Sequence, residues 1–481
     1  MFQRNALAGV VMTMIVGLAV SAAAQTGFSD DIADYVWDLS SLCSSDAAFE
    51  DERAQVAAEL DSIGRYRGTS SDGPAALAAA LDAVSDLRGR AGKLYLYAAL
   101  TAEIDITDER AQQRLDAASA LEAQMTAAIS FLRSEVLALG AETVGRWIDE
   151  HPAVARHKIR LLRILREGPY TRGPEAQEII DGLERWPRMM IDFFDMINES
   201  GYCWPQVRNS DGETVTIDRV TFRRLRRETD TAFRDRAVSA YLQSLAGLEK
   251  FFGAVYTKRC EADLAIAQAR NFASGIDAIW FLREQMPPGS HRTVIDVAHE
   301  NIPLLRRYVR LRNRALGIAE PTYMDLYRQP ANPGAEFPIN RALQISCAAL
   351  SVFGSEYQER LRGRIADGQL HLPPMENKRP TYGIFPAVAD AKSYFLFSYQ
   401  PTYRHARALA GGLLLLMAFS DIPSDLEPDS RDDPGIYSNG LIYVGDMLFD
   451  DQLLRETTAT PERVALLLNA LELLWNNFFE W

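Results

Sequence analysis

Residues 394–419 read YFLFSYQPTYRHARALAGGLLLLMAF, and this stretch decides the fold. The aromatic-rich segment at 392–399 predicts a β-strand. Residues 403–419 predict a helix, which contains the adjacent pair Gly411 and Gly412. Each glycine costs about 1 kcal/mol relative to alanine inside a helix. We therefore expect a strand followed by a helix, with another backbone packed closely against the two glycines.

Most of the remaining chain has the periodicity of amphipathic helices. We expect further helices at residues 46–63, 75–100, 108–139, 144–166, 174–197, 222–236, 236–274, 293–316, 342–367, 442–454 and 461–479. A turn-rich stretch at 201–212 and a short strand at 213–217 interrupt the series. The sequence therefore predicts an all-α fold with a small β element and a domain boundary near residue 205.

The first 24 residues have the composition of a secretory signal peptide. Arg4 supplies the positive charge, residues 6–20 are apolar, and SAAA at 21–24 is a small-residue cleavage pattern. The apolar run is too short for a comfortable membrane span, although a retained anchor is the alternative. We expect cleavage before Gln25 and export to the periplasm or the outside, with no membrane span afterwards.

The formal net charge of the 481 residues is −14. A surface this acidic disfavours nucleic acid and anionic membranes as partners. The four cysteines are Cys43, Cys203, Cys260 and Cys347. None forms a C-x-x-C pair, and four are too few for a disulfide framework in a chain of this length, so we expect free thiols.

Several short motifs follow one another along the chain. They are VWDL at 36–39, IDITD at 104–108, RDR at 234–236, NIPLL at 301–305, MDLY at 324–327 and NK at 377–378. In their order and spacing, these motifs resemble the oligoendopeptidase F branch of the thimet-oligopeptidase-like zinc peptidases. The resemblance implies two lobes around a cleft. It assigns residues 25–205 to an N-terminal helical domain and residues 206–481 to a peptidase-like domain.

The resemblance also implies where a zinc site would lie. In the family, a His-Glu-x-x-His helix supplies two zinc ligands and the general base, and a later helix supplies a third ligand, a glutamate. Residue-by-residue matching places Gly411 and Leu415 at the histidines and Gly412 at the glutamate. Val444 falls at the third ligand, or Asp446 if the match shifts by two residues. The family continues beyond the position of Trp481 with Tyr and His residues that stabilise the transition state, so we expect a degenerate and C-terminally short member.

Other histidines offer weak substitutes for the missing ligands. His299 begins a similar motif, but Pro303 follows four residues later. His405 lies on the altered helix and could meet Asp446 or Asp450, although a lone packed histidine is the ordinary interpretation. No cofactor is therefore expected, and zinc would be expected only if a rebuilt site existed.

Aromatic and hydroxyl side chains beside the implied cleft could contact a peptide. In the family, the backbone of a peptide pairs with a strand of this kind. The peptide-groove candidates are Tyr382, Ser398, Tyr399, Tyr403 and Tyr443. Packing of these tyrosines against leucines is an equally good interpretation.

Taken with the implied loss of ligands, the sequence favours a secreted or periplasmic homologue that binds peptides or a protein partner, such as an active paralogue, without cleaving them. Two alternatives stay open at this point. One is an active zinc-dependent oligopeptidase with a rebuilt metal site, and the other is a decayed chain without a selected function.

Overall fold

The computed structural model describes residues 27–173, 180, 183, 202–226, 230–284, 286–327, 336–379, 383–385, 391–420 and 435–456. The described chain is mainly helical, with one two-stranded and one three-stranded sheet, as the sequence predicts. Among the described residues, no helix is long and apolar enough to span a membrane. The division at residue 205 stays a prediction.

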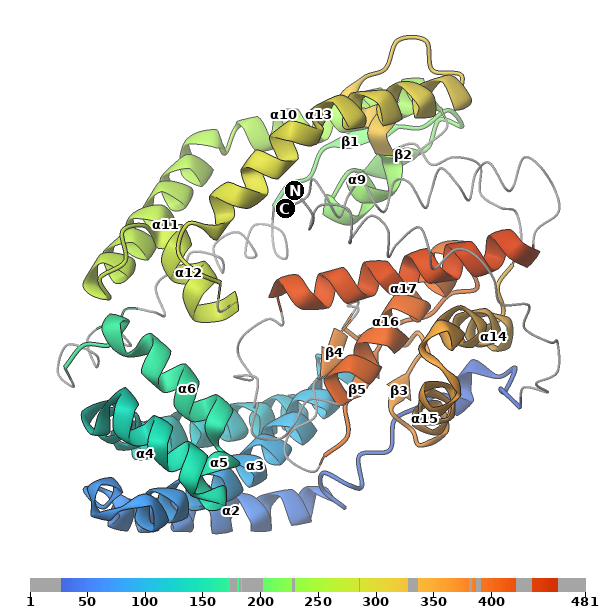
Figure 1. Ribbon diagram of the computed structural model, residues 1–481. Helices are drawn as coiled ribbons and strands as arrows, with labels where there is room; N and C mark the ends of the chain where they lie inside the picture. The colour runs from blue at the N-terminus through green and yellow to red at the C-terminus, as the bar shows by residue number, and fades with distance from the viewer. Residues whose placement is uncertain are drawn as a thin grey trace.

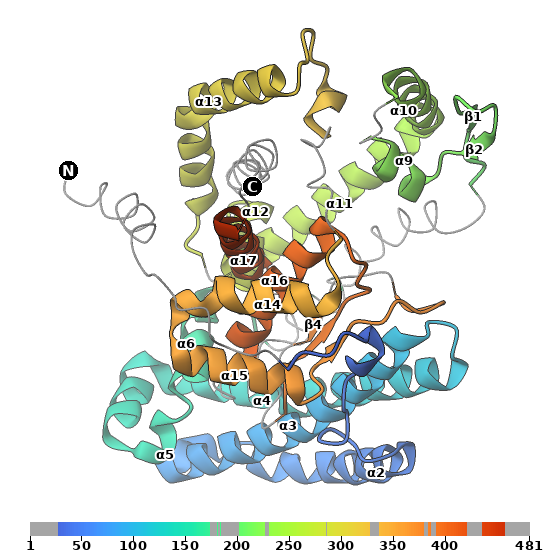
Figure 2. The ribbon, with the colours of Figure 1, turned by 90° about the vertical axis from the view of Figure 1, so that its right-hand side faces the viewer.

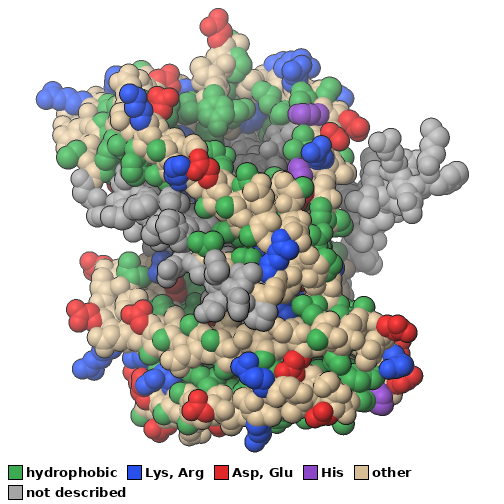
Figure 3. Space-filling model, turned by 90° about the vertical axis from the view of Figure 1, so that its left-hand side faces the viewer, with side chains coloured by type: hydrophobic (Ala, Val, Ile, Leu, Met, Phe, Trp, Pro, Cys, Tyr) green, Lys and Arg blue, Asp and Glu red, His purple; other side chains and the backbone are tan. Residues whose placement is uncertain are grey.

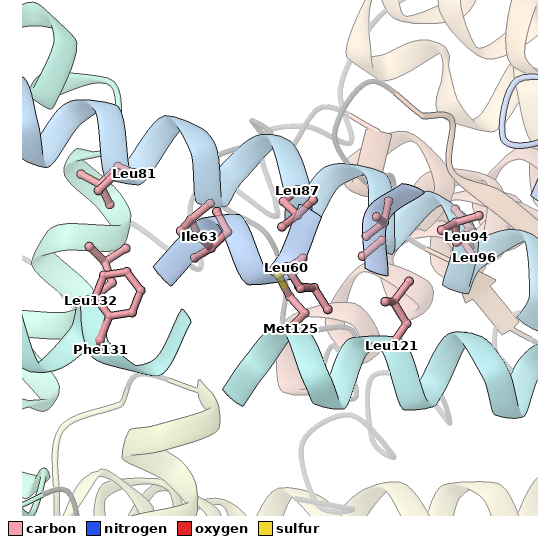
Figure 4. Packing of buried hydrophobic residues seen from close by; sticks show 14 of the residues in the cluster. Leu60, Ile63, Leu81, Leu87, Leu94, Leu96, Leu121, Met125, Phe131 and Leu132 are labelled. Atoms are coloured by element: carbon pink, nitrogen blue, oxygen red, sulfur yellow. The ribbon is translucent and has the colours of Figure 1, made fainter. Parts of the chain in front are cut away.

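The N-terminal helices pack into a bundle. They are α2 (Asp46–Ile63), α3 (Pro74–Ile104), α4 (Glu109–Glu150), α5 (Pro152–Ala155) and α6 (Lys158–Glu167). Ser45 and Asp108 begin α2 and α4 as N-caps, because their side-chain oxygens accept backbone N–H groups of the first turn. Figure 4 shows leucine, isoleucine, methionine and phenylalanine side chains of these helices meeting in one buried cluster.

The bundle follows the predicted helices closely, with two differences. The predicted helix at 144–166 is divided between the end of α4, α5 and α6. Helix α2 has the predicted bounds, whereas residues 108–150 form one long element with a kink at Gly140, whose φ of 78° is left-handed. A glycine adopts this conformation without the Cβ clash that other residues meet there. The predicted helix at 174–197 lies almost entirely outside the described residues.

A second group of elements forms the upper part of the molecule in Figure 1. It contains β1 (Gln206–Arg208), β2 (Thr214–Thr216), α9 (Arg219–Leu225), α10 (Thr231–Ala246), α11 (Glu249–Ala269), α12 (Gly275–Glu284) and α13 (Ser290–Ala315). The helical segment predicted at 236–274 therefore comprises the end of α10, which stops at Ala246, and all of α11. Buried Asp325 ties this group together, because it accepts a hydrogen bond from Arg234 of α10 at 2.8 Å and its backbone oxygen accepts one from Arg312 of α13 at 2.8 Å.

The third group lies between the other two in both ribbon views (Figures 1 and 2). It comprises α14 (Ile339–Ala349), α15 (Ser355–Ala366), β3 (Leu370–His371), β4 (Gly383–Phe385), β5 (Tyr394–Leu396), α16 (Tyr403–Ser420) and α17 (Gly435–Glu456). Helix α16 agrees with the predicted helix, whereas β5 is shorter than predicted and α17 begins seven residues earlier. The predicted helix at 461–479 lies outside the described residues.

The three-stranded sheet has the order β3-β5-β4, with β3 parallel and β4 antiparallel to β5. The central strand β5 is fully buried. The N-terminal segment anchors it, since Trp37 packs edge-on against Tyr394 and the Tyr394 hydroxyl donates to the backbone oxygen of Asp38 at 3.1 Å. The sheet therefore presents a rigid surface on which α16 rests.

Charged side chains of both signs are scattered among apolar ones over the face shown in Figure 3. All four cysteines are free, with Cys347 buried and Cys203 and Cys260 exposed.

Candidate functional site

Helices α16 and α17 touch through their backbones. A Cβ atom added to Gly445 of α17 would lie 2.6 Å from the Cα of Gly411 and 2.8 Å from the carbonyl oxygen of Ala410. Real Cβ atoms essentially never come this close to a backbone atom, so only glycine fits at Gly445. The close backbone approach that the adjacent glycines predict is thus present at Gly411.

The second glycine of the pair lies under an aromatic ring. A Cβ atom on Gly412 would stand 2.3 Å from the Cζ of Phe395, the central residue of β5. Gly411, Gly412 and Leu415 are all buried, and none of them carries a side-chain atom that could bind a metal ion. Val444, at the implied third position, is a hydrocarbon side chain with 42% of its surface exposed.

These residues do not fit a zinc ion. Zinc in proteins is held by sulfur, nitrogen or carboxylate oxygen from Cys, His, Asp and Glu. In the part of the chain that the structure describes, no three such side chains come together as a possible metal site. The Phe395 ring takes the volume that a side chain at 412 would need, and the backbone of α17 at Gly445 lies against the backbone of Gly411.

A polar cluster lies one helical turn before the glycine pair. We call it the Arg407 cluster, and it consists of Tyr403 and Arg407 on α16 with Asp446 and Asp450 on α17. The Nε of Arg407 is 3.5 Å from Oδ2 of Asp446, and its Nη1 is 3.8 Å from Oδ2 of Asp450. The Tyr403 hydroxyl donates to Oδ1 of Asp450. The four side chains therefore link α16 to α17 beside the backbone contact.

Burial governs the protonation of this cluster. It raises the pKa of Asp446 to about 7 and that of Asp450 to about 6, against the opposing effect of the Arg407 charge. Burial acts to lower the pKa of Arg407, but the two carboxylates and the Tyr403 phenol outweigh it and raise that pKa overall. The guanidinium thus stays charged while the carboxylates titrate near neutral pH.

His405 and Asp446, the weak metal candidates, have separate partners. The Nδ1 of His405 accepts the backbone N–H of Gln400 at 2.8 Å, and the ring packs against Phe397 with centroids 5.1 Å apart. Burial lowers the pKa of His405, and the charge of Arg404 lowers it further. Asp446 faces Arg407 instead.

The sequence did not predict a role for Arg407. Its spacing of four residues from position 411, and of eight from position 415, places it on the same helical face as both.

The peptide-groove candidates have varied surroundings. Tyr399 is 2% exposed, and its hydroxyl donates to the backbone oxygen of Phe337 at 2.6 Å. Tyr403 is bonded within the Arg407 cluster, and Ser398 is half-buried. Tyr382 lies outside the described residues, and Tyr443 lies on α17 with its side chain outside them. The hydroxyls of Tyr399 and Tyr403 therefore bond inside the protein.

The chain is similar to curated peptidases over much of its length. It is 23% identical over 320 residues to group B oligopeptidase PepB of Streptococcus agalactiae, covering 65% of this chain and 52% of that protein. It is 20% identical over 385 residues to the plasmid-encoded oligoendopeptidase F of Lactococcus lactis subsp. cremoris, covering 78% and 62%. These similarities relate the chain to the oligoendopeptidase F family. It spans between half and two thirds of the length of these curated relatives.

Solved structures show the same fold. A crystal structure of a peptidase from Chlamydophila abortus superposes with a TM-score of 0.74 at 19% identity, over 94% of this chain and 75% of that one. Oligoendopeptidase-F from Enterococcus faecium superposes with a TM-score of 0.61 at 18% identity, over 90% and 72%. No family model matches the chain.

The packing around Gly412 predicts the effect of a single added methyl group. Gly412→Ala should destabilise the protein by about 1–3 kcal/mol, because overpacking forces the Phe395 ring or α16 to move. Urea unfolding monitored by circular dichroism measures this change. Gly363→Ala in α15 is the matched control, because its Cβ meets nothing within 4 Å, and it should be neutral or stabilising. Equal effects of the two substitutions would contradict the tight contact.

The raised carboxyl pKa values predict a pH dependence of stability. A carboxyl group whose pKa is higher in the folded state than in the unfolded state stabilises the folded protein when it is protonated. This stabilisation is complete below the pKa of the unfolded state and is lost as the pH rises through the pKa of the folded state. The wild type should therefore gain stability relative to Asp446→Asn as the pH falls from about 8 to about 5, as the folded pKa near 7 requires. Urea midpoints at several pH values measure the difference. Asp451→Asn, a half-exposed position on α17, is the control, and a constant difference for Asp446→Asn would refute the raised pKa.

Proposed function

We propose that this protein is a non-catalytic member of the oligoendopeptidase F family that works without zinc. The observation that carries the proposal is the α16–α17 contact. The residues at the implied ligand and general-base positions lack donor atoms, and Gly445 and Phe395 fill the space beside them. These positions offer no ligand for zinc and no carboxylate to activate water. The groups that would carry out zinc-dependent peptide hydrolysis in the family are therefore absent from them.

The proposed activity is binding of a peptide or of a protein partner, with an active paralogue as one form of that partner. Strand β4 supports the peptide version, because it is one of the two outer strands of the three-stranded sheet and, unlike those of β3, its residues are only half-buried. An extended peptide could add a further strand to such an edge through main-chain hydrogen bonds. The signal-like sequence at 1–24 supports a periplasmic or secreted location.

The alternative of an active zinc enzyme would need a rebuilt ligand set. His405 and Asp446 are the candidates on these helices, but the Nδ1 of His405 is bonded to the Gln400 backbone and Asp446 faces the Arg407 guanidinium. A metal ion beside Asp446 would meet the repulsion of that positive charge. The described geometry therefore favours the non-catalytic proposal.

Metal content and turnover test this proposal together. Protein purified without chelator should contain far less than one zinc per chain by elemental mass spectrometry. It should also cleave a panel of internally quenched peptides no faster than buffer. An oligoendopeptidase F with an intact His-Glu-x-x-His motif, purified and assayed in parallel, is the control. Stoichiometric zinc, or turnover that a chelator abolishes, would overturn the proposal.

Binding without cleavage has its own signature. A peptide that binds only the folded protein should stabilise it, by about 2.7 kcal/mol when the free peptide is at 100 times its dissociation constant. Thermal unfolding with the same peptide panel measures this shift, and mass spectrometry of the recovered peptide shows whether it stayed intact. Hydrogen exchange should then slow at 383–385 if β4 is the docking strand. Absence of any stabilisation across the panel would leave the protein-partner version and eliminate the peptide version.

A further inference from the structure

Two buried carboxylates stand on successive turns of α17. Asp446 is 6% exposed and Asp450 is fully buried, and their spacing of four residues places them on one helical face. Buried charges are costly unless a charge of opposite sign compensates them. The compensating group here is the guanidinium of Arg407, which reaches across from α16.

The rest of the surroundings cannot take over this role. The rings of Phe337 and Phe449 pack against Tyr403 at 6.1 Å and 6.5 Å, so the cluster has apolar walls. Arg404 and Arg223 are further cations nearby. Burial lowers the pKa of Arg404, and repulsion from the positive charges of Arg407 and Arg223 lowers it further. No salt bridge joins Arg404 or Arg223 to a described acidic side chain.

The contact between Asp446, Asp450 and Arg407 is electrostatic. At 3.5 Å and 3.8 Å the charged atoms are separated by more than ordinary hydrogen-bond lengths, and the Nε of Arg407, the Oδ1 of Asp446 and the Oδ2 of Asp450 have no hydrogen-bond partner. Attraction between opposite charges is strong in a buried setting and depends less on direction than a hydrogen bond. One central cation can therefore hold both carboxylates.

We propose that Arg407 is a built-in cation that fastens α16 to α17 through Asp446 and Asp450, in place of a metal ion between these helices. The backbone contact at Gly411 and Gly445 sets the distance between the helices, and the charges hold it there. This role explains how the helix pair stays closed when the ligand positions carry no donor atoms. It does not depend on whether the protein binds a peptide.

The decisive variant is Arg407→Met, which keeps much of the side-chain volume and removes the charge. At about pH 8, where Asp446 and Asp450 are mostly ionised, it should lower the Tm by roughly 3–5 °C, because it leaves buried carboxylates without a counter-charge. Hydrogen exchange measured by mass spectrometry should quicken in α16 and α17 and stay unchanged in α3 and α4. Arg404→Met is the matched control on the same helix and should change neither readout.

A second pair of variants separates charge from general packing. Arg407→Lys keeps a cation and should recover part of the lost Tm, whereas Arg407→Gln should not. An Arg407→Met protein with the Tm and exchange pattern of Arg404→Met would overturn the proposal. So would equal effects of Lys and Gln at position 407. Neither result depends on zinc content or peptide turnover, so failure here is distinguishable from failure of the non-catalytic function.

Discussion

The contact between the backbones of Gly411 and Gly445 is the constraint on which the centre of the molecule depends. Side chains normally keep helix axes 8–10 Å apart, and glycine at the crossing point removes that limit. With the helices this close, Arg407 of α16 can reach Asp446 and Asp450 of α17. Helix α16 also packs against β5, where Gly412 lies against the Phe395 ring. The β5 strand, α16 and α17 therefore form one unit, fixed to the N-terminal segment through Trp37 and Tyr394.

Much of this fold could be predicted because its signals are local. Helix α2 and helix α16 have the predicted bounds within one residue, since amphipathic spacing and N-capping residues lie within each segment. Strand β5 is shorter than its composition suggests because strand length depends on partners, and β3 supplies only two residues for pairing. The end of α10 before Gly247 could not be placed from the sequence, because a glycine within a helical pattern can be tolerated or can end the helix.

The candidate site likewise has parts that the sequence predicts and contacts that only the fold shows. The identities of Gly411, Gly412 and Leu415 could be read directly from the sequence, and they set the expectation of a degenerate site. The partner of Asp446 could not, because Arg407 is 39 residues away and pairs with it only after α17 folds back along α16. Tyr399 and Tyr403 illustrate the same limit, since a tyrosine can line a groove or bond internally, and only the fold shows their hydroxyls bonded to Phe337 and Asp450.

The small residues at 411 and 412 and the close contact between α16 and α17 support each other. A glutamate at 412 would need volume that the Phe395 ring occupies, and a side chain at 445 would collide with the backbone of Gly411. Without a metal, that glutamate would also be buried without a partner, at a cost of several kcal/mol. Each feature therefore supports the other: glycine permits the contact, and the contact leaves no room for a larger side chain at Gly412 or Gly445. A larger side chain at Gly412 or Gly445 would meet this packing barrier, so the close contact and the glycines that permit it depend on each other.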